Sequence, residues 1–222
     1  MTKRINYIDL TPELKTKEYN TLIMGIIFLG LLITTIIANN TIVATFVNTH
    51  LVPVIIGYII LALIGVMMSI HSDRPMISFI GYLLVVSPTG MLLSAVIEEY
   101  GGISSSVVIN AFIITMIITI LFAISGFIFP NFYDKIGSIL LVSLAGLIIV
   151  QIIFMLIGID PTWMSFIGAT IFSLYIGYDI HKAQTRRHTV DNAIDAAVGL
   201  YLDIINLFLH ILSISNGSSD DW

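Results

Sequence analysis

Cysteine is absent from the 222-residue sequence, and this absence excludes disulfides, thiolate catalysis and thiolate metal sites. Charge is also scarce, because 10% of the residues are Asp, Glu, Lys or Arg, against about 25% in soluble domains. The charged residues are unevenly spread, with none between Glu18 and Asp73 and none from Ile136 to Ile159. Most of the chain therefore lacks side chains suited to water, and a soluble domain is excluded. The first 20 residues contain no apolar signal-peptide core, so we expect none to be cleaved.

What the sequence does contain is a series of apolar runs, each about as long as the roughly 20 residues that cross a hydrocarbon core as a helix. Turn residues and charges, such as those of the segment from His71 to Pro75, separate the runs. They predict an all-α integral membrane protein with seven transmembrane helices, at 21–38, 51–70, 76–97, 107–129, 137–158, 162–180 and 193–213.

The basic residues predict the orientation of these helices. With the N-terminus in the cytoplasm, all nine Lys and Arg residues fall in the N-terminal tail or in inner loops. We therefore expect a cytoplasmic tail at 1–20, a transmembrane domain at 21–214 and an outer acidic tail at 215–222. The outer loops then carry only the acids Glu98, Glu99 and Asp160. This acidic outer rim either concentrates cations by its field or consists simply of solvated loop charges.

Two aspartates interrupt the last two apolar runs and are the leading candidates for a functional site, because ionisable residues inside a membrane cost about 2.5–3.5 kcal/mol each on insertion scales. Asp179 and Asp203 are equidistant from residue 191, beside the polar turn between the two runs. If the sixth helix continues past Lys182, the antiparallel hairpin places both carboxyl groups at similar depth. The alternative is that Asp179 ends its helix in water, beside Lys182.

Two carboxyl groups that meet in a low dielectric cannot both ionise cheaply, so we expect the pair to share a proton. Such a pair is a two-state element, which is closed when a proton bridges it and opened when both groups are ionised and repel each other. Asn206 and His210 share a helical face with Asp203 and are candidates for lining an ion route. Asn206 serves equally well as a polar contact between helices.

The run from Ser173 to Leu212 resembles the Bax inhibitor family, also called the transmembrane Bax inhibitor motif family. The resemblance rests on the segments SLYIGYD at 173–179 and LYLDIINLF at 200–208. It implies a seven-helix fold in which the other six helices surround the last one. It also implies a pH-sensitive calcium leak, with Asp179 and Asp203 as the sensor pair and as the acids that meet the metal ion.

Family members can also hold the first aspartate with an arginine on the second span, which acts as a latch. No basic residue occurs at 61–70 in this chain. The candidate latches are therefore the nearest basic residues, His71, Arg74 and Lys182.

We expect no tightly bound cofactor, because calcium takes 6–8 oxygen ligands and conduction requires weak, transient binding of the transported ion. The expected partners are the lipid bilayer, calcium and protons, without nucleic acid, and the expected location is a cell membrane, specifically the bacterial cytoplasmic membrane.

Three other interpretations remain: a proton-coupled carrier, a non-conducting membrane regulator and an intramembrane aspartyl protease. The protease is disfavoured because Leu200, Tyr201 and Leu202 replace the Gly-x-Gly that precedes its second aspartate. The sequence thus predicts a non-enzymatic protein.

Overall fold

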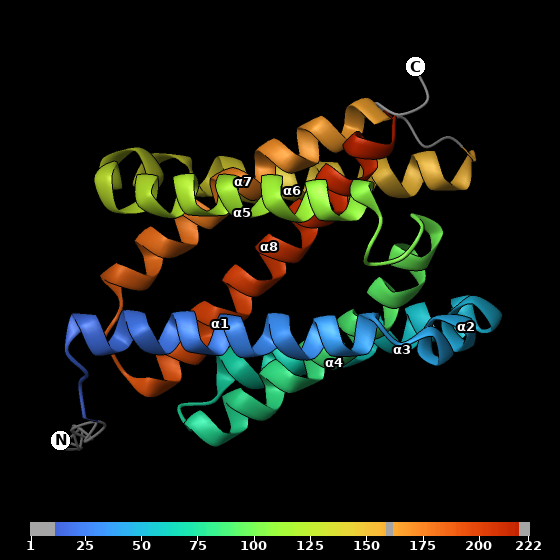
Figure 1. The fold of residues 1–222 in the computed structure, drawn as a ribbon. Helices are drawn as coiled ribbons and strands as arrows, with labels where there is room; N and C mark the ends of the chain where they lie inside the picture. The colour runs from blue at the N-terminus through green and yellow to red at the C-terminus, as the bar shows by residue number, and fades with distance from the viewer. Residues whose placement is uncertain (1–11, 159–161, 218–222) are drawn as a thin grey trace, which may run out of the picture.

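The computed structural model describes residues 12–158 and 162–217. Within these ranges the chain forms eight α-helices and no strand (Figure 1). The helices are α1 (Thr16–Ala38), α2 (Thr41–Thr49), α3 (Leu51–His71), α4 (Pro75–Glu99), α5 (Ser106–Ile128), α6 (Pro130–Leu156), α7 (Thr162–Thr185) and α8 (Val190–Gly217).

Seven of these helices cover the seven apolar runs, and the prediction of an all-helical membrane protein is confirmed. Six of them, α1, α3, α4, α5, α6 and α8, are long and apolar enough to cross a membrane in the part of the chain that is described. The seventh, α7, falls outside this set, and its sequence includes polar residues such as Ser165, Ser173 and Asp179. The count of seven spans and the cytoplasmic N-terminus stay predictions.

The short helix α2 was not predicted, because Asn39 and Asn40 indicate a turn but do not indicate that a helix begins directly after it. The Asn40 side chain accepts hydrogen bonds from the backbone N–H groups of Ile42, at 3.0 Å, and Val43, at 3.4 Å. These bonds satisfy donors that a helix start leaves free, which is why Asn is favoured at this position. With nine residues, α2 is too short to cross a membrane.

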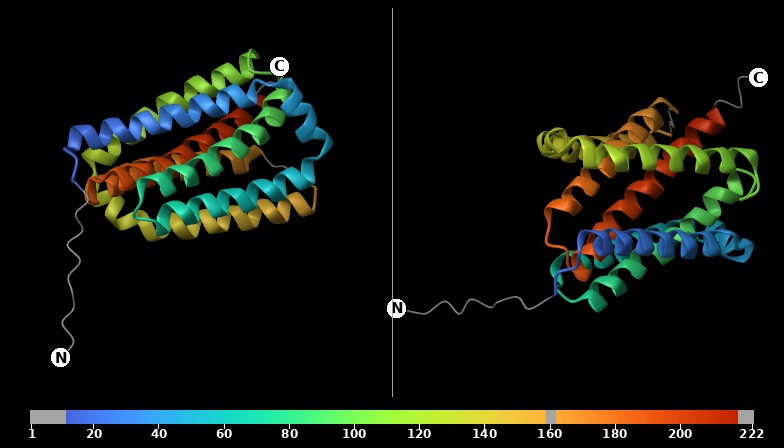
Figure 2. Two further views of the ribbon diagram at one scale, coloured as in Figure 1. Left: turned by 90° about the horizontal axis from the view of Figure 1, so that it is seen from below. Right: turned by 60° about the vertical axis from the view of Figure 1, so that its left-hand side comes forward.

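The last helix, α8, runs obliquely between two groups of helices (Figures 1 and 2). One group contains α1, α3 and α4, and the other contains α5, α6 and α7. The principal neighbours of α8 are α7, α1, α5, α4 and α3, whereas α6 packs mainly on α7. The last helix is therefore central as expected, but five helices rather than six form most of its surroundings.

The outer surfaces of the bundle are apolar. Large side chains such as Ile64 on α3, Ile120 on α5 and Val142 on α6 are exposed. Only 6% of the apolar stretch of α3 and 11% of that of α6 are buried inside the protein, against 56% for α8. An exposed apolar surface this extensive is typical of contact with lipid rather than water. The chain is a multi-pass membrane protein.

Candidate functional site: an aspartate pair beside an amphipathic cavity

The site begins at the hairpin of α7 and α8. α7 continues past Lys182 and ends at Thr185, and α8 begins at Val190. The two helices form the most extensive helix–helix contact of the described chain. Asp179 lies on α7, six residues before its end, and its side chain is half-buried. The carboxylate is directed at α8, because its Oδ2 atom occupies the space where a Cβ at Gly199 would stand.

Asp203 lies on α8 one helical turn after Gly199, so the two positions share a face of the helix. Its side chain is buried, with 8% of the residue exposed. Its Oδ2 atom has no hydrogen-bond partner among the described residues. The two carboxyl groups are close enough to interact electrostatically. A buried acceptor without a partner is costly unless it is protonated or meets a cation. The arrangement therefore suits the exchange of a proton or the transient binding of a cation.

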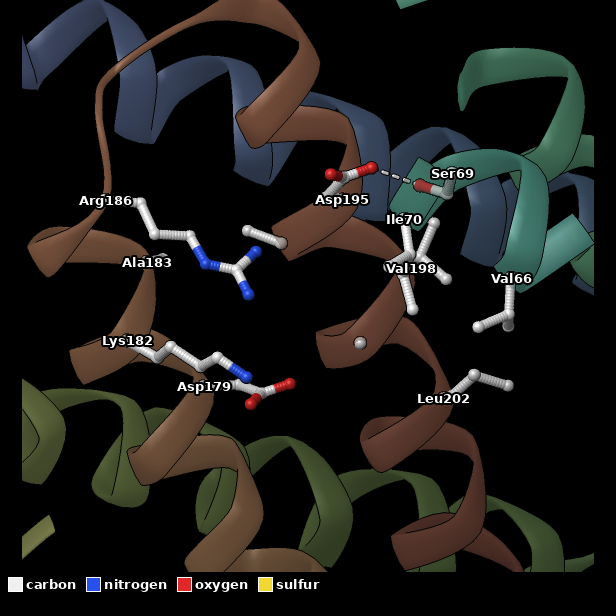
Figure 3. A pocket seen from close by; sticks show the side chains of 12 residues that line it. Val66, Ser69, Ile70, Asp179, Lys182, Ala183, Arg186, Asp195, Val198 and Leu202 are labelled. Carbon is white, nitrogen blue, oxygen red and sulfur yellow. Dashed lines mark hydrogen bonds between the residues drawn. The ribbon is translucent and has the colours of Figure 1, made fainter. Parts of the chain in front are cut away.

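A cavity of about 170 Å³ lies beside Asp179, where α3, α7 and α8 meet (Figure 3). Each helix contributes residues from one face. Its lining includes Val66, Ser69 and Ile70 from α3, Asp179, Lys182 and Ala183 from α7, Arg186 from the following loop, and Asp195, Val198, Gly199 and Leu202 from α8. Asp195 accepts a hydrogen bond from the Ser69 hydroxyl, which ties α8 to α3. The cavity is thus an amphipathic space with carboxylates and cations on its walls.

Two cations act on the Asp179 carboxylate. Lys182, one turn further along α7, and Arg186, in the loop after α7, both attract it electrostatically. Figure 3 shows both side chains at the cavity that Asp179 lines. The Lys182 ammonium also lies 5.6 Å from the centre of the Tyr178 ring.

The three candidate latches are placed differently. Lys182 lines the cavity, whereas neither His71 nor Arg74 is among the lining residues. His71 forms a hydrogen bond of 3.1 Å between its Nδ1 atom and the Met67 carbonyl oxygen. Arg74 precedes the first residue of α4. Arg186 is the additional cation that the sequence reasoning missed, because loop residues carry no periodicity from which their direction could be predicted.

Two further carboxylates of α8 were also missed as site residues. Asp191 accepts a hydrogen bond of 2.7 Å from the Ser78 hydroxyl of α4, and Asp195 accepts one from Ser69 of α3. A signal was present in the sequence: Asp191, Asp195, Gly199 and Asp203 recur every four residues, and this spacing places them along one face of a helix. The Asp179 side chain, on α7, contacts that face of α8 at Gly199. The acidic face of α8 therefore extends from the start of the helix to Asp203.

The two candidates for the ion route beyond Asp203 make local contacts. The Asn206 side chain donates a hydrogen bond of 2.8 Å to the Leu202 carbonyl oxygen within α8. The His210 ring stacks on Phe172, with the ring centres 5.6 Å apart, and fills the space beside Gly168 of α7. Both residues are half-buried, and a role in an ion route stays a prediction.

Of the outer acids, Glu98 and Glu99 are not among the residues that line the cavity. Glu98 and Glu99 are exposed at the end of α4, and Glu98 accepts a hydrogen bond of 3.0 Å from the Asn48 side chain of α2. Asp160 lies outside the described residues.

No group of three or more His, Asp or Glu residues is placed to hold a metal ion in the described ranges. Asp179 and Asp203 by themselves would supply only part of the 6–8 oxygen ligands that calcium takes. If these residues meet calcium as a transported ion, water and other oxygen atoms must complete its coordination.

The fold and site define a class: a multi-pass helical membrane protein with two electrostatically interacting aspartates on its last two helices. Residues 12–220 match the family model described as "Inhibitor of apoptosis-promoting Bax1". The chain belongs to the Bax inhibitor family.

Its relatives come from bacteria, fungi and plants. Bax inhibitor 1 of Schizosaccharomyces pombe is 30% identical over 143 residues, which are 62% of this chain and 51% of the yeast protein. The BI1-like protein of Arabidopsis thaliana is 41% identical over 85 residues, or 37% of this chain and 33% of the plant protein. An uncharacterized protein of Borreliella burgdorferi is 27% identical over 229 residues, covering 92% of this chain and 96% of the bacterial protein. The matches to the yeast and plant proteins thus span about half and one third of those proteins.

Proposed function

We propose that this protein is a pH-sensitive calcium leak channel, in which Asp179 and Asp203 share a proton and thereby hold the route closed. The observation that carries the proposal is the burial of Asp203, whose Oδ2 atom has no partner among the described residues, while the Asp179 carboxyl group of α7 contacts α8 one turn away, at Gly199, and interacts with Asp203 electrostatically. A carboxyl group so placed is expensive in a membrane and is a functional site by default.

The chemistry of the pair determines the direction of the pH dependence. One shared proton joins the two carboxyl groups and favours the packed arrangement of α7 and α8. Loss of that proton as the pH rises leaves two negative charges in a low dielectric, and their repulsion favours separation of the helices. Calcium flux should therefore increase as the pH rises through the titration of the pair.

A leak suits the donor set better than a tight binding site does. Two carboxylates, hydroxyl groups and backbone oxygens offer calcium weak and incomplete coordination. Conduction requires that an ion enter a site and also leave it readily. The cavity beside Asp179 provides charged groups in an amphipathic lining on one side of the pair, and Asn206 and His210 are the candidates on the other side.

The test is calcium entry into liposomes that contain the purified protein and a trapped calcium indicator, measured across a series of pH values. We expect flux that depends on protein and on pH, with protein-free liposomes and heat-inactivated protein as controls. A proton gradient without a calcium gradient should drive no calcium uptake, which distinguishes a leak from a proton-coupled carrier. Absence of protein-dependent flux at every pH would contradict the proposed function.

A further inference from the structure

The walls of the cavity carry balanced charges. Asp179 and Asp195 contribute two acids, and Lys182 and Arg186 contribute two bases. With all four groups ionised the cavity has no net formal charge, although it lies on the acidic face of α8. Its attraction for a cation therefore depends on whether both bases remain in place.

Arg186 is the base that comes from outside the helices, and its direction is determined by the loop between α7 and α8. The neighbouring Arg187 donates a hydrogen bond of 2.8 Å to Glu13, on the segment before α1. The Leu14 N–H donates one of 2.7 Å to the His188 carbonyl oxygen of the same loop. The next residues of the loop are thus held against the N-terminal segment, while the Arg186 side chain reaches into the cavity (Figure 3).

The Arg186 charge acts on both acids of the cavity, because it attracts Asp179 on α7 and Asp195 on α8. A mobile cation that approached either carboxylate from this end of the bundle would meet the same guanidinium group. Arg186 is thus placed to compete with such a cation for both acids.

We infer that Arg186 is a charge filter at this end of the cation route, a tethered cation that keeps mobile cations out of the cavity between α3, α7 and α8. The inference rests on the proposed function for the route to which the cavity would lead. The ligand class is a small inorganic or organic cation. The specificity is electrostatic, because no shape-selective pocket is needed to repel a charge.

The absence of cysteine allows a direct test with single engineered thiols. Val66 on α3 and Leu202 on α8 both line the cavity, across from Arg186 (Figure 3), and both are half-buried. The Val66→Cys and Leu202→Cys proteins are placed in lipid nanodiscs, where reagents in solution can approach the protein from both membrane faces. Each is treated with two methanethiosulfonate reagents of similar size, one bearing a trimethylammonium group and the other a sulfonate. The measured quantity is the ratio of the cationic to the anionic modification rate.

We expect Arg186→Gln to raise this ratio about tenfold at both positions, which is the lower end of the effect of charged clefts on local ion concentration. Arg187→Gln removes the same charge from the adjacent residue and should change the ratio less than about twofold. Both arginines are exposed, but Arg187 pairs with Glu13 and does not line the cavity. Arg186→Lys restores the charge and should return the ratio to the wild-type value. This rescue excludes a general loosening of the fold.

An unchanged ratio in Arg186→Gln, or an equal rise in Arg187→Gln, would overturn the inference. Failure of both thiols to react in every variant would overturn it as well, since the cavity would then be closed to ions from solution. The proposed function is judged separately by calcium flux. If the wild-type protein shows no calcium flux but the ratio of modification rates still rises in Arg186→Gln, the proposed channel is contradicted and the charge filter is supported. If calcium flux depends on pH but the ratio is unchanged in Arg186→Gln, the proposed channel is supported and the charge filter is contradicted.

Discussion

The Oδ2 atom of Asp179 lies in the space that the Cβ of any residue other than glycine would take at position 199. This contact brings a carboxyl group from α7 onto the face of α8 that carries Asp203 one turn away. Glycine at 199 therefore permits the pair to form, and its role is to provide room rather than unusual backbone torsion.

Gly199→Ala should displace the Asp179 side chain, because that side chain is the flexible neighbour and the helices are not. We expect the midpoint of the pH profile of calcium flux to move by roughly one unit, since about 1.4 kcal/mol of altered interaction corresponds to one unit. Gly146→Ala on α6 is the matched control, because a Cβ there meets no atom within 4 Å. An unchanged pH profile in Gly199→Ala would show that the position of Asp179 does not control flux.

Asp203→Asn and Asp179→Asn should each flatten the pH dependence of calcium flux, because neither variant retains two acids that can repel each other. The double variant should be no worse than either single one, since residues that act as a unit are non-additive. The measurement is flux into liposomes at the same pH series for all three variants. If either single variant keeps the wild-type profile, the pair is not the sensor.

Tyr19 of α1 should stabilise the bundle by holding the loop after α7. The side chain is fully buried, its ring stacks on His188 with centres 4.4 Å apart, and its hydroxyl donates a hydrogen bond of 3.3 Å to the Asn192 carbonyl oxygen. Tyr19→Ala should lower stability by about 3–5 kcal/mol, as for other buried aromatic rings. Tyr19→Phe, which loses only the hydroxyl, should cost about 1 kcal/mol. Thermal unfolding in detergent ranks the two, and equal transition temperatures would refute this role.

The orientation is testable with tags at the two ends of the chain. If the basic residues control insertion, an N-terminal tag is shielded in intact cells and a tag after Trp222 is accessible from outside. Accessibility to an antibody before and after permeabilisation measures both. A shielded C-terminal tag would contradict the count of seven spans.

Neutralising Glu98, Glu99 and Asp160 together should lower calcium flux modestly, and by less at high salt. Dissolved ions screen the field of exposed charges beyond a Debye length of about 8 Å at physiological ionic strength, and this length shortens as salt is added. The comparison is flux at low and high salt for the triple variant and for wild type. A loss as large as that of Asp203→Asn, independent of salt, would assign the outer acids a direct part in conduction.

Much of the architecture could be predicted because it is encoded in short stretches of sequence. Apolar runs of the right length indicated the long helices, and the hairpin between residues 179 and 203 indicated that the aspartates belong together. Helix α2 was not predicted because its nine residues give too weak a periodic signal. The number of membrane spans is not decided by hydropathy alone, because α7 contains polar residues and falls outside the span candidates.

The sequence by itself determined that this is a helical membrane protein whose costly acids lie on its last two helices. The reason is that placing polar groups in lipid costs free energy, and this cost applies to every short segment independently. Only the tertiary structure decided that α3 forms the third wall of the cavity, that Ser69 binds Asp195 and that Arg186 lines the cavity while Arg187 binds Glu13. The contacts of Ser69 with Asp195 and of Arg187 with Glu13 join segments more than 100 residues apart in the chain, which the crossing of the helices brings together. No local pattern encodes that crossing, because it results from the packing of the whole bundle.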